Sequence, residues 1–478
     1  MSSVTSLQCF EKLLGPKGVI TDPGDIAPWL SDWRGRWHGK SAAILAPANT
    51  QQVSETIKLA SEHNIQLVPQ GGNTSMVGGA TPPEDGRALI LSLRRMNHIR
   101  SISEESNQAV CEAGVILSTL HDSAENIGRR FPLSLGAKGS ATIGGLISTN
   151  AGGTQVLRHG TMRGLVEGIE AVLPDGSIYE GLVPLKKDNR GYDLRHLLIG
   201  AEGTLGVVTA ATLRLVPAMT RRTTAWVGVN SPHDALTLLR LLQERLGSIL
   251  EGFEVLAGDC LTHVLSHIPD ARAPIETPAP WHALIEADLS AIQADAPDPL
   301  EAVLGHALEQ DIILDATLAH NQAQASTFWR LRESISEAER TIGPAVQFDI
   351  SVPIAKMPDF MVDTARAASA AFSGTSATSY GHMGDGNVHF HVRAPTGTDN
   401  GPAWIAEQGK PISCFVHDAV VAAGGSISAE HGIGQMKRAE LGRLSSPARI
   451  QAMRAIKSAL DPKGIMNPEK LIPLASEG

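Results

Sequence analysis

Two glycine-rich stretches in the first third of the chain constrain its fold more than any other feature. The first, Pro69–Gly79, directly follows an apolar run that is typical of a strand. The second, Pro132–Gly153, is dominated by small residues, is too long for a single turn and has too few bulky side chains to build a core of its own. Because glycine lets a backbone approach another group closely, these stretches predict a site where main chain surrounds a flat, polar ligand.

The first stretch also favours phosphate binding. Its Gly-Gly-Asn-Thr-Ser segment exposes backbone N–H groups and short hydroxyls, which can cradle a pyrophosphate. It matches neither G-x-G-x-x-G nor G-x-x-x-x-G-K-[ST], so an ordinary glycine turn is the alternative. A third glycine segment, Gly200–Gly206, leads into a strand predicted over Val207–Leu215.

The order of the remaining patterns predicts an α+β chain with two domains. After an arm of about 40 residues, a strand, a helix with Thr50 as its N-cap and a second strand form a β-α-β unit. An Asp-Gly turn at Gly176 predicts a β-hairpin. Beyond Pro217, strands alternate with amphipathic helices, which indicates a cap with an antiparallel sheet. The helices expected in this cap include residues 232–246 and 322–341, and a further long helix is expected over 435–460, after the Glu-His pair.

A strand predicted at residues 387–393 points two histidines the same way. Asn387, His389 and His391 alternate with apolar residues and therefore share one face. A Met-Gly-Asp-Gly turn can fold His382 back beside His389. With the carboxylate of Glu430, two His and one Glu form a three-ligand set that leaves a metal position open. The pattern predicts a catalytic divalent metal site, with zinc expected.

Glu430 is followed by His431, and both lie between small residues and glycines. In an extended strand they would face opposite sides, so both reach one site only if the chain turns there, which Gly432 and Gly434 allow. We expect Glu430 to bind the metal and His431 to act as a base. The alternative is that these are ordinary loop residues.

Composition excludes several classes of function. The 478-residue chain carries a formal charge of −10 and has no Lys/Arg run that would neutralise nucleic-acid phosphates. Its four cysteines are scattered, as free thiols in a reducing compartment would be. The first residues show no secretory signal, and no apolar run approaches the ~20 residues of a membrane span. We therefore expect a cytoplasmic protein without a transmembrane segment.

Taken together, the motifs resemble the FAD-linked D-2-hydroxyacid dehydrogenases of the vanillyl-alcohol oxidase superfamily, over nearly the whole chain. The landmarks are Asp32–Gly35, Pro69–Gly79, Ser134–Gly153, Glu202–Gly206, Gly381–His389, Glu430–Gly432 and Asn467–Pro468. The resemblance implies an FAD-binding domain of the PCMH type, built from two subdomains, and an α+β cap. The implied divisions are an arm at residues 1–40, the FAD-binding domain at 41–217, the cap at 218–425 and a segment at 426–478 that returns to the FAD-binding domain.

The resemblance also implies which residues hold non-covalently bound FAD. The two glycine-rich stretches would contact its pyrophosphate and adenosine, and the segment around Asn467 would return toward the flavin ring. The implied contacts are Gln70, Gly71, Gly72, Asn73, Thr74, Ser75, Pro132, Gly136, Thr142, Gly145, Ser148, Gly152, Gly153, Glu202, Gly206 and Asn467.

For the chemistry, the resemblance makes His382, His389 and Glu430 zinc ligands and His431 the general base. It makes Arg332 the group that binds the substrate carboxylate, because a planar guanidinium suits a carboxylate. Ser336 follows Arg332 one turn later on the same helix face. The alternative for Arg332 is an ordinary surface charge.

Two positions depart from the pattern of similar D-2-hydroxyglutarate enzymes. Gln347 stands where they often have Lys, and His391 stands where they often have Asn. A neutral amide can donate a hydrogen bond but offers no full charge to a second carboxylate. D-2-hydroxyglutarate remains the first expectation for the substrate, and D-lactate-like or D-malate-like acids are the alternatives.

The expected reaction is oxidation of a D-2-hydroxy acid to the 2-keto acid, with Gln347 among the residues near the substrate. A separate electron acceptor is expected, namely an electron-transfer flavoprotein, a quinone or a cytochrome, and a homodimer is one expected assembly. Three alternatives differ in class: a non-redox flavoprotein like alkyl-glycerone phosphate synthase, an oxidase that uses oxygen, and a flavin-binding scaffold without a substrate.

Overall fold

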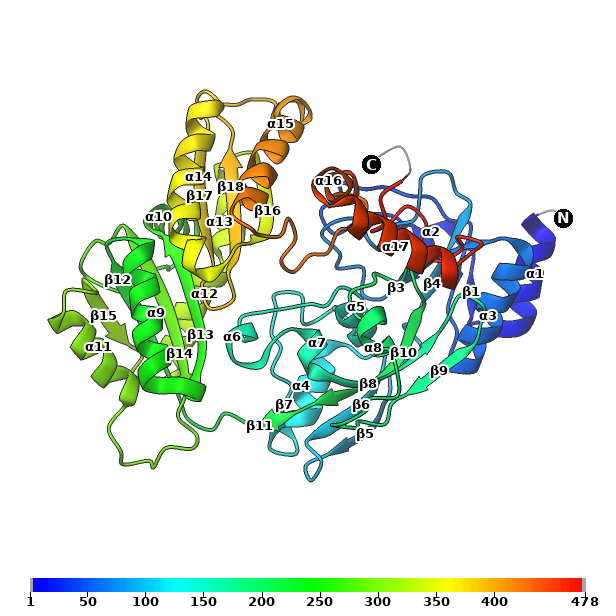
Figure 1. Ribbon diagram of the computed structural model, residues 1–478, viewed down its shortest axis with the longest axis horizontal. Coiled ribbons are helices and arrows are strands. Elements are labelled where there is room, and N and C mark those ends of the chain that lie inside the picture. Colours follow the sequence, from blue (N-terminus) through cyan, green and yellow to red (C-terminus); the bar gives the residue numbers. More distant parts are fainter. Residues whose placement is uncertain (1–2, 475–478) are drawn as a thin grey trace. The chain divides into compact units, whose positions relative to one another are not determined.

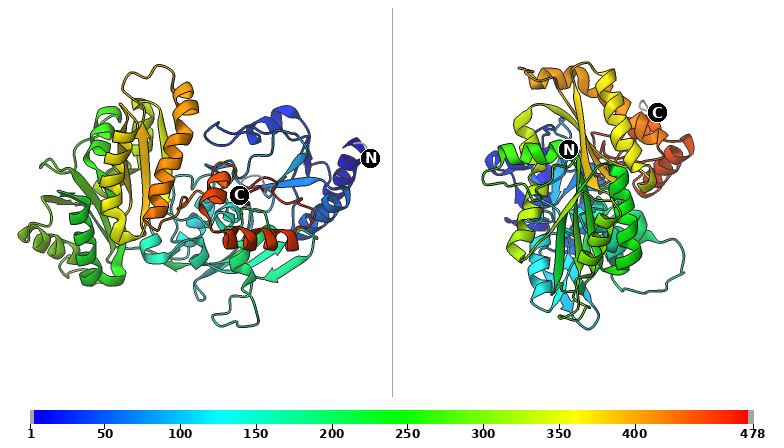
Figure 2. Two further views of the ribbon diagram at one scale, coloured as in Figure 1. Left: turned by 45° about the horizontal axis from the view of Figure 1, so that its top comes forward. Right: turned by 90° about the vertical axis from the view of Figure 1, so that its left-hand side faces the viewer.

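The computed structural model describes residues 3–474, which divide into two compact units. The first unit contains the chain up to Gly153, Gly160–Ala218 and the part from Glu430 onward, and the second contains Thr154–His159 and Met219–Ala429. Figures 1 and 2 show the red C-terminal helices among the blue and cyan elements of the first unit. The C-terminal segment therefore belongs to the same unit as the start of the chain.

A four-stranded sheet in the first unit has the order β1-β2-β4-β3. Strands β2 and β3 both pair parallel with β4, so the two strands of the predicted β-α-β unit are separated by β4. Helices α1 and α3 lie side by side and pack next to this four-stranded sheet (Figure 1). The elements are α1 (Ser3–Leu14), β1 (Val19–Ile20), α2 (Pro23–Ile26), a 3-10 turn (Ala27–Trp29), β2 (Ile44–Leu45), α3 (Thr50–His63), β3 (Gln66–Gln70) and β4 (Ala88–Ser92).

The second sheet of this unit has five antiparallel strands in the order β5-β6-β10-β8-β9. The predicted hairpin is confirmed, because β8 and β9 pair on either side of the Asp-Gly turn. The elements are β5 (Ile99–Ser103), β6 (Gln108–Glu112), α4 (Leu117–Glu125), β7 (Arg129–Arg130), α5 (Ile143–Ser148), α7 (Met162–Leu165), β8 (Val166–Val172), β9 (Ile178–Gly181), α8 (Leu194–Leu198), β10 (Val207–Arg214), β11 (Val216–Pro217), α16 (Arg438–Leu444) and α17 (Pro447–Leu460).

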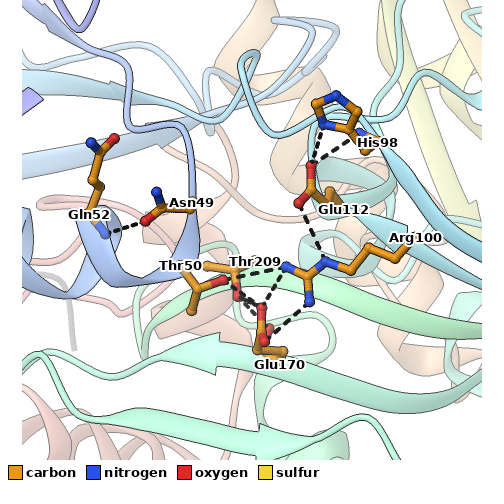
Figure 3. Close-up of polar contacts among 8 residues, drawn as sticks. All are labelled: Asn49, Thr50, Gln52, His98, Arg100, Glu112, Glu170 and Thr209. Atoms are coloured by element: carbon orange, nitrogen blue, oxygen red, sulfur yellow. Dashed lines mark hydrogen bonds and ion pairs between the residues drawn. The ribbon is translucent and has the colours of Figure 1, made fainter. Parts of the chain in front are cut away.

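A polar network joins the start of α3 to the five-stranded sheet (Figure 3). Arg100 on β5 donates to both carboxylate oxygens of Glu170 on β8, and the hydroxyl of Thr50 donates to the same carboxylate at 2.6 Å. Burial would raise the pKa of Glu170, but the hydrogen bonds from Arg100 and Thr50 outweigh it and lower the pKa. The prediction of Thr50 as the N-cap is wrong, because Asn49 is extended and its side chain accepts the amide hydrogen of Gln52.

The second unit is built on a seven-stranded antiparallel sheet in the order β15-β12-β14-β13-β17-β18-β16, as expected for the cap. One face is covered, with the larger apolar core, by helices α9 (Pro232–Leu246), α11 (Pro299–Glu309), α14 (Met357–Ala371) and α15 (Gly401–Ala422). The opposite face is covered by helices α10 (Gly258–His267), α12 (Gln322–Glu333) and α13 (Ile335–Ile342). The strands are β12 (Arg222–Val229), β13 (Leu250–Ala257), β14 (Trp281–Asp288), β15 (Asp315–Leu318), β16 (Ala345–Ser351), β17 (Ser376–His382) and β18 (Asn387–Arg393).

The helices of the second unit include α6, a short piece from the middle of the first unit's sequence. Arg158 holds it to the sheet by donating to Glu251 at 2.7 Å and to Asp288 at 2.8 Å. The helices are α6 (Val156–His159), α9 (Pro232–Leu246), α10 (Gly258–His267), α11 (Pro299–Glu309), α12 (Gln322–Glu333), α13 (Ile335–Ile342), α14 (Met357–Ala371) and α15 (Gly401–Ala422), with 3-10 turns at Gly247–Ile249 and Ile354–Lys356.

Two helices that the sequence predicts as continuous are each divided in two. The helix expected over 435–460 breaks before Pro447, which has no amide hydrogen to continue the ladder. Ser446 caps the new helix by accepting from the amide of Arg449. The helix expected over 322–341 breaks at Ser334, where no side chain caps the start of α13. None of the helices within residues 3–474 combines the length and apolar character that a membrane span requires.

Candidate active site

A cavity of about 740 Å³ lies within the first unit, and both glycine-rich stretches line it. Most of the residues predicted to hold the cofactor are in its wall. They are Gln70, Gly71, Gly72, Asn73, Thr74, Ser75, Gly136, Thr142, Gly145, Ser148, Gly152, Glu202 and Gly206. Pro132, Gly153 and Asn467 are outside this lining, whereas Trp33, Glu430 and His431 belong to it.

The two glycine stretches pack against each other so closely that side chains would not fit between them. A Cβ atom on Gly71 would overlap the Thr142 hydroxyl, and one on Gly72 would overlap the carbonyl of Ser140. Asn73 has a φ of 53°, in the left-handed region that asparagine tolerates. Glycine at 71 and 72 therefore brings bare backbone to the cavity wall, as the sequence predicts.

The Thr142 hydroxyl and the side-chain carbonyl oxygen of Gln70 are buried at this wall, and neither has a hydrogen-bond partner among residues 3–474. The amide nitrogen of Gln70 is engaged, since it donates to the carbonyls of Trp29 and Ala80 at 3.0 and 2.9 Å. Orphaned buried polar atoms in a protein usually indicate a ligand or water that completes them. The wall therefore suits a polar, elongated ligand.

Glu202 fixes the loop that carries Glu430 and His431. Its two carboxylate oxygens accept the amide hydrogens of Ile433 at 2.7 Å and Gly434 at 2.8 Å. Burial raises the pKa of Glu202, although these two hydrogen bonds act against the rise. The carboxylate that lines the cavity therefore also positions the Glu-His pair.

Asn467, in the C-terminal segment, is hydrogen-bonded to the loops that line the cavity. Its side-chain amide donates to the carbonyls of Glu202 at 2.6 Å and Gly79 at 3.1 Å. It thus joins two of the segments that line the cavity, and its predicted contact with the cofactor stays a prediction.

In the second unit, His382 on β17 and His389 on β18 lie on the same face of the sheet, with ring centroids 5.5 Å apart. Each is paired across neighbouring strands with a buried acid. His382 is the register partner of Glu254 on β13 and donates from Nδ1 to its carboxylate at 2.5 Å. His389 is the register partner of Asp349 on β16, and its Nδ1 lies 4.0 Å from that carboxylate.

The hydrogen bond to Glu254 decides which ring nitrogen of His382 can bind a metal. A carboxylate only accepts hydrogen bonds, so Nδ1 of His382 carries the proton and Nε2 carries the lone pair. Histidines that bind metals are commonly oriented in this way by a carboxylate. The donor set of His382 and His389 therefore fits a divalent ion that prefers nitrogen ligands.

Arg332 is not a surface charge, because only 8% of the residue is exposed. Its Nε and Nη2 atoms donate to Glu254 at 2.9 and 2.7 Å. Burial would raise the pKa of Glu254, but attraction to His382 and Arg332 outweighs it and lowers the pKa. Glu254 thus holds a predicted carboxylate-binding group and a predicted metal ligand side by side.

Ser336, predicted to share a helix face with Arg332, instead lies in the first turn of the next helix, α13. The two residues still converge on one aromatic ring. The Ser336 hydroxyl lies 3.1 Å from the Tyr380 hydroxyl, and the Arg332 guanidinium lies 4.8 Å from the centre of the Tyr380 ring. That ring is also 5.0 Å from the His389 ring, so Tyr380 connects the predicted catalytic side chains.

Gln347 and His391, the two positions that depart from the family pattern, are direct register partners on β16 and β18. They therefore lie on the same face as His389. His391 donates from Nδ1 to Glu339 on α13, and Arg393 donates to the other oxygen of that carboxylate at 3.0 Å. The sequence analysis noted His391 but not this buried acid.

The predicted site residues thus fall into two groups. The structure brings together His382, His389 and Arg332 in the second unit, and it places Glu430 and His431 at the cavity of the first unit. The prediction that Glu430 shares one ion with the two histidines stays a prediction.

The functional side chains that sequence reasoning missed are the buried acids Glu254, Asp349 and Glu339, together with Tyr380 and Arg393. Glu254 and Asp349 each had a local signal, since each is an acid between two apolar residues of a strand. Glu339 had no comparable signal, because it lies on a helix and its partners lie on β18.

Comparison with protein families gives two matches. The family described as FAD linked oxidases, C-terminal domain, matches residues 218–471, and the one described as FAD binding domain matches residues 41–181. D-2-hydroxyglutarate dehydrogenase, mitochondrial, of Arabidopsis thaliana is 38% identical over 97% of this chain and 81% of its own length. The Bos taurus protein of the same name is 38% identical over 98% and 84%. D-2-hydroxyglutarate dehydrogenase of Stutzerimonas stutzeri is 35% identical over 96% and 97%.

Solved structures support the fold. An alkyldihydroxyacetonephosphate synthase superposes with a TM-score of 0.75 at 16% identity, over 98% of this chain and 86% of that one. A p-cresol methylhydroxylase gives a TM-score of 0.69 at 16% identity, over 98% of this chain and 96% of that one.

The expectation of a cytoplasmic location is wrong by the sequence comparisons, because similar proteins from Arabidopsis thaliana and Bos taurus are named mitochondrial.

Proposed function

The chain belongs to the family of FAD-linked oxidases, and we propose that it oxidises D-2-hydroxy acids to 2-keto acids with FAD and a bound divalent metal, zinc being preferred. The observation that carries the proposal is the sharing of Glu254 by Arg332 and His382. A 2-hydroxy acid has a carboxylate directly beside its hydroxyl. A carboxylate-binding cation fixed next to a metal-binding imidazole matches that pair of groups.

FAD fits the cavity of the first unit. The glycine-rich wall offers bare backbone, and the unpartnered Thr142 hydroxyl offers a donor of the kind that a phosphate oxygen accepts. The lining also contains His431, a side chain able to move a proton. These features support FAD binding, which we propose to be non-covalent.

The metal would be held by His382, His389 and Glu430. The two histidines present a fitting donor set, as their buried carboxylate partners indicate. Chain connectivity supports Glu430 as the third ligand. Ser426 pairs with Ser351 at the end of the sheet, and only three residues separate Ser426 from Glu430.

When bound, FAD accepts the hydride from C2 of the substrate, and the metal lowers the pKa of the substrate hydroxyl. The protein then has three tasks. Arg332 binds and orients the carboxylate, and Glu254 keeps Arg332 and His382 in place. His431 takes the hydroxyl proton, since an imidazole titrates near neutral pH. The Tyr380 ring packs against the Arg332 guanidinium and restricts its motion, and the Ser336 hydroxyl in turn contacts the Tyr380 hydroxyl.

Anaerobic reduction of the flavin tests the proposal. A D-2-hydroxy acid should bleach the flavin absorbance of the FAD-loaded protein, and its L-enantiomer should not. His431→Ala should slow the bleaching by at least about 100-fold while FAD stays bound, because it removes the base. His306→Ala, which changes an exposed histidine at the end of α11, is the control and should bleach like wild type. Failure of every D-2-hydroxy acid with FAD and metal present would refute the proposed reaction.

Removal of the metal separates this chemistry from the non-redox use of the same fold. A chelator should abolish bleaching, and zinc should restore it, whereas a reaction that does not need the substrate chelated would survive. The reoxidation rate then distinguishes an oxidase from a dehydrogenase. We propose a separate acceptor, so an electron-transfer flavoprotein, a quinone or a cytochrome should reoxidise the flavin much faster than air.

A further inference from the structure

The segment Thr154–His159, which contains α6, belongs to the second unit, although the residues before and after it belong to the first. Arg158 anchors this segment, because one of its guanidinium nitrogens donates to Glu251 at 2.7 Å and to Asp288 at 2.8 Å. Burial would lower the pKa of Arg158, but the hydrogen bonds to the two carboxylates outweigh it and raise the pKa. The anchor is therefore a permanent cation held between two anions.

Glu251 is aimed at this contact by a β-bulge. The register of β13 against β14 shifts across Glu251, which is the additional residue of the bulge, and its side chain is only 1% exposed. The same strand carries Glu254, which holds Arg332 and His382. One strand therefore anchors both α6 and two predicted side chains of the site.

Leu157 joins α6 to the hairpin that carries the two predicted histidine ligands. Gly384 lies in the turn between His382 and His389, and a Cβ atom on it would come within 2.7 Å of Leu157 Cδ1 and 3.0 Å of Leu157 Cβ. The Leu157 side chain thus packs on the bare backbone of this turn, and it also packs against the larger apolar core. Because protein interiors are close-packed, a displacement of α6 would shift the turn or leave a gap beside it.

At its base, the segment is tied to the wall of the cavity in the first unit. The amide of Met162 donates to the carbonyl of Ala151 at 2.9 Å, and the amide of Arg163 donates to the side chain of Asn150 at 2.9 Å. Ala151 lines the cavity, and only two residues lie between it and the segment. Since a residue spans at most about 3.6 Å, this connection has little slack.

We propose that Leu157 and Arg158 are positioning residues for hydride transfer: through them, the segment Thr154–His159 keeps the metal-binding hairpin at the distance from the cofactor that the reaction needs. This role rests on the proposed function, because it concerns the transfer between the substrate and FAD. A misplacement of about 1 Å can cost roughly 100-fold in rate. A loosened α6 should therefore slow the reaction while both binding sites remain.

Leu157→Ala tests this role, and Leu157→Met is the matched control because it conserves the volume of the side chain. Anaerobic flavin reduction in the FAD- and zinc-loaded protein is followed with D-2-hydroxyglutarate or D-lactate, whichever reduces the wild-type flavin faster. Leu157→Ala should lower the limiting rate at saturating acid by at least about tenfold. The half-saturating acid concentration and the Kd values of FAD and zinc should stay within about threefold of wild type, and Leu157→Met should match wild type in all four.

The other anchor is tested by combining Arg158→Met with Glu251→Gln. The double change removes the hydrogen bond between the two residues without leaving the buried carboxylate of Glu251 unpaired. It should lower the limiting rate as Leu157→Ala does, again with FAD and zinc affinities close to those of wild type.

Flavin fluorescence measures the separation without turnover. Cu2+ binds nitrogen and oxygen ligands more tightly than Zn2+ does, and Cu2+ in the metal site would quench flavin emission by energy transfer that falls steeply with distance. Leu157→Ala should change the emission lifetime of the Cu2+-loaded protein, and Leu157→Met should not.

Three results would overturn the positioning role alone. They are an unchanged limiting rate, an unchanged lifetime, and a loss of FAD or zinc binding that accounts for the lost rate, since α6 would then only support one of the two sites. Absence of flavin reduction in the wild-type protein by every D-2-hydroxy acid would overturn the proposed function as well.

Discussion

Replacing Glu254 by Gln is the most informative single change in the second unit. The substitution keeps the shape of the side chain and removes its charge. Glu254 is fully buried and accepts from Arg332 at 2.9 and 2.7 Å and from His382 at 2.5 Å. A glutamine has one accepting oxygen in place of two and turns an NH2 group toward a donor.

The expected loss of stability follows from the burial of the ion pair between Glu254 and Arg332. Exposed ion pairs contribute about 0–1 kcal/mol, but removing one partner of a buried pair costs about 3–5 kcal/mol because the other charge is left without compensation. Arg332 is only 8% exposed, so the larger figure applies. His382 also loses the group that fixes its ring, which typically weakens metal binding about 10–100-fold.

Two measurements check this prediction. Denaturant unfolding of the metal-free protein should show the unfolding free energy of Glu254→Gln lowered by about 3 kcal/mol or more. Zinc binding, measured in competition with a chromogenic chelator, should give a dissociation constant about 10–100-fold larger than that of wild type. Glu333→Gln is the control, since Glu333 is exposed beside Arg332 on the same helix. Unfolding within 1 kcal/mol of wild type and unchanged zinc affinity would refute the role given to Glu254.

Two further predictions concern the first unit. Gly72→Ala should abolish FAD retention and destabilise the fold by about 1–3 kcal/mol, because its Cβ would overlap the backbone of Ser140. Gly305→Ala, on α11 and outside the cavity lining, brings its Cβ within 4 Å of no described atom and should retain FAD and fold like wild type. Flavin absorbance after gel filtration and thermal unfolding measure the two effects. Glu170→Gln should cost about 2 kcal/mol of unfolding free energy at pH 7, since it breaks charged hydrogen bonds. Because folding lowers the pKa of Glu170, its contribution to stability is complete above the pKa of the unfolded state and is lost as pH falls through the pKa of the folded state. The difference in unfolding free energy between Glu170→Gln and wild type should therefore disappear on acidification. Glu180→Gln, at an exposed position, should show no such difference at any pH.

Local patterns in the sequence predicted most elements with strong periodicity. Helix α9 begins at Pro232 after its capping Ser231, and β18 alternates polar and apolar residues along its whole length, so both were predictable to the residue. The helix breaks at Ser334 and Pro447 were missed. The break at Pro447 could have been predicted, because a proline within a helical pattern signals that the helix ends just before it. Ser334 gave no such signal, because tertiary packing decides where that helix breaks.

The candidate site was predictable only as far as its residues are local in sequence. His382 and His389 sit within one hairpin and were therefore found from spacing alone. Their acids Glu254 and Asp349 come from strands 128 and 40 residues away, counted from 254 to 382 and from 349 to 389. Strand order and register create those pairs, and neither can be derived from periodicity.

Register is therefore the property on which the chemistry of the second unit depends, and the apolar side of β18 is what fixes it. Val388, Phe390 and Val392 are fully buried in the larger core. A slip of one residue against β17 would bring these three toward the polar face and push His389 and His391 into that core. At about 1.5–3 kcal/mol for each buried apolar side chain, such a slip would forfeit several kcal/mol before any buried imidazole is counted. The three apolar residues thus hold the histidines opposite their acids, although none of them touches the site.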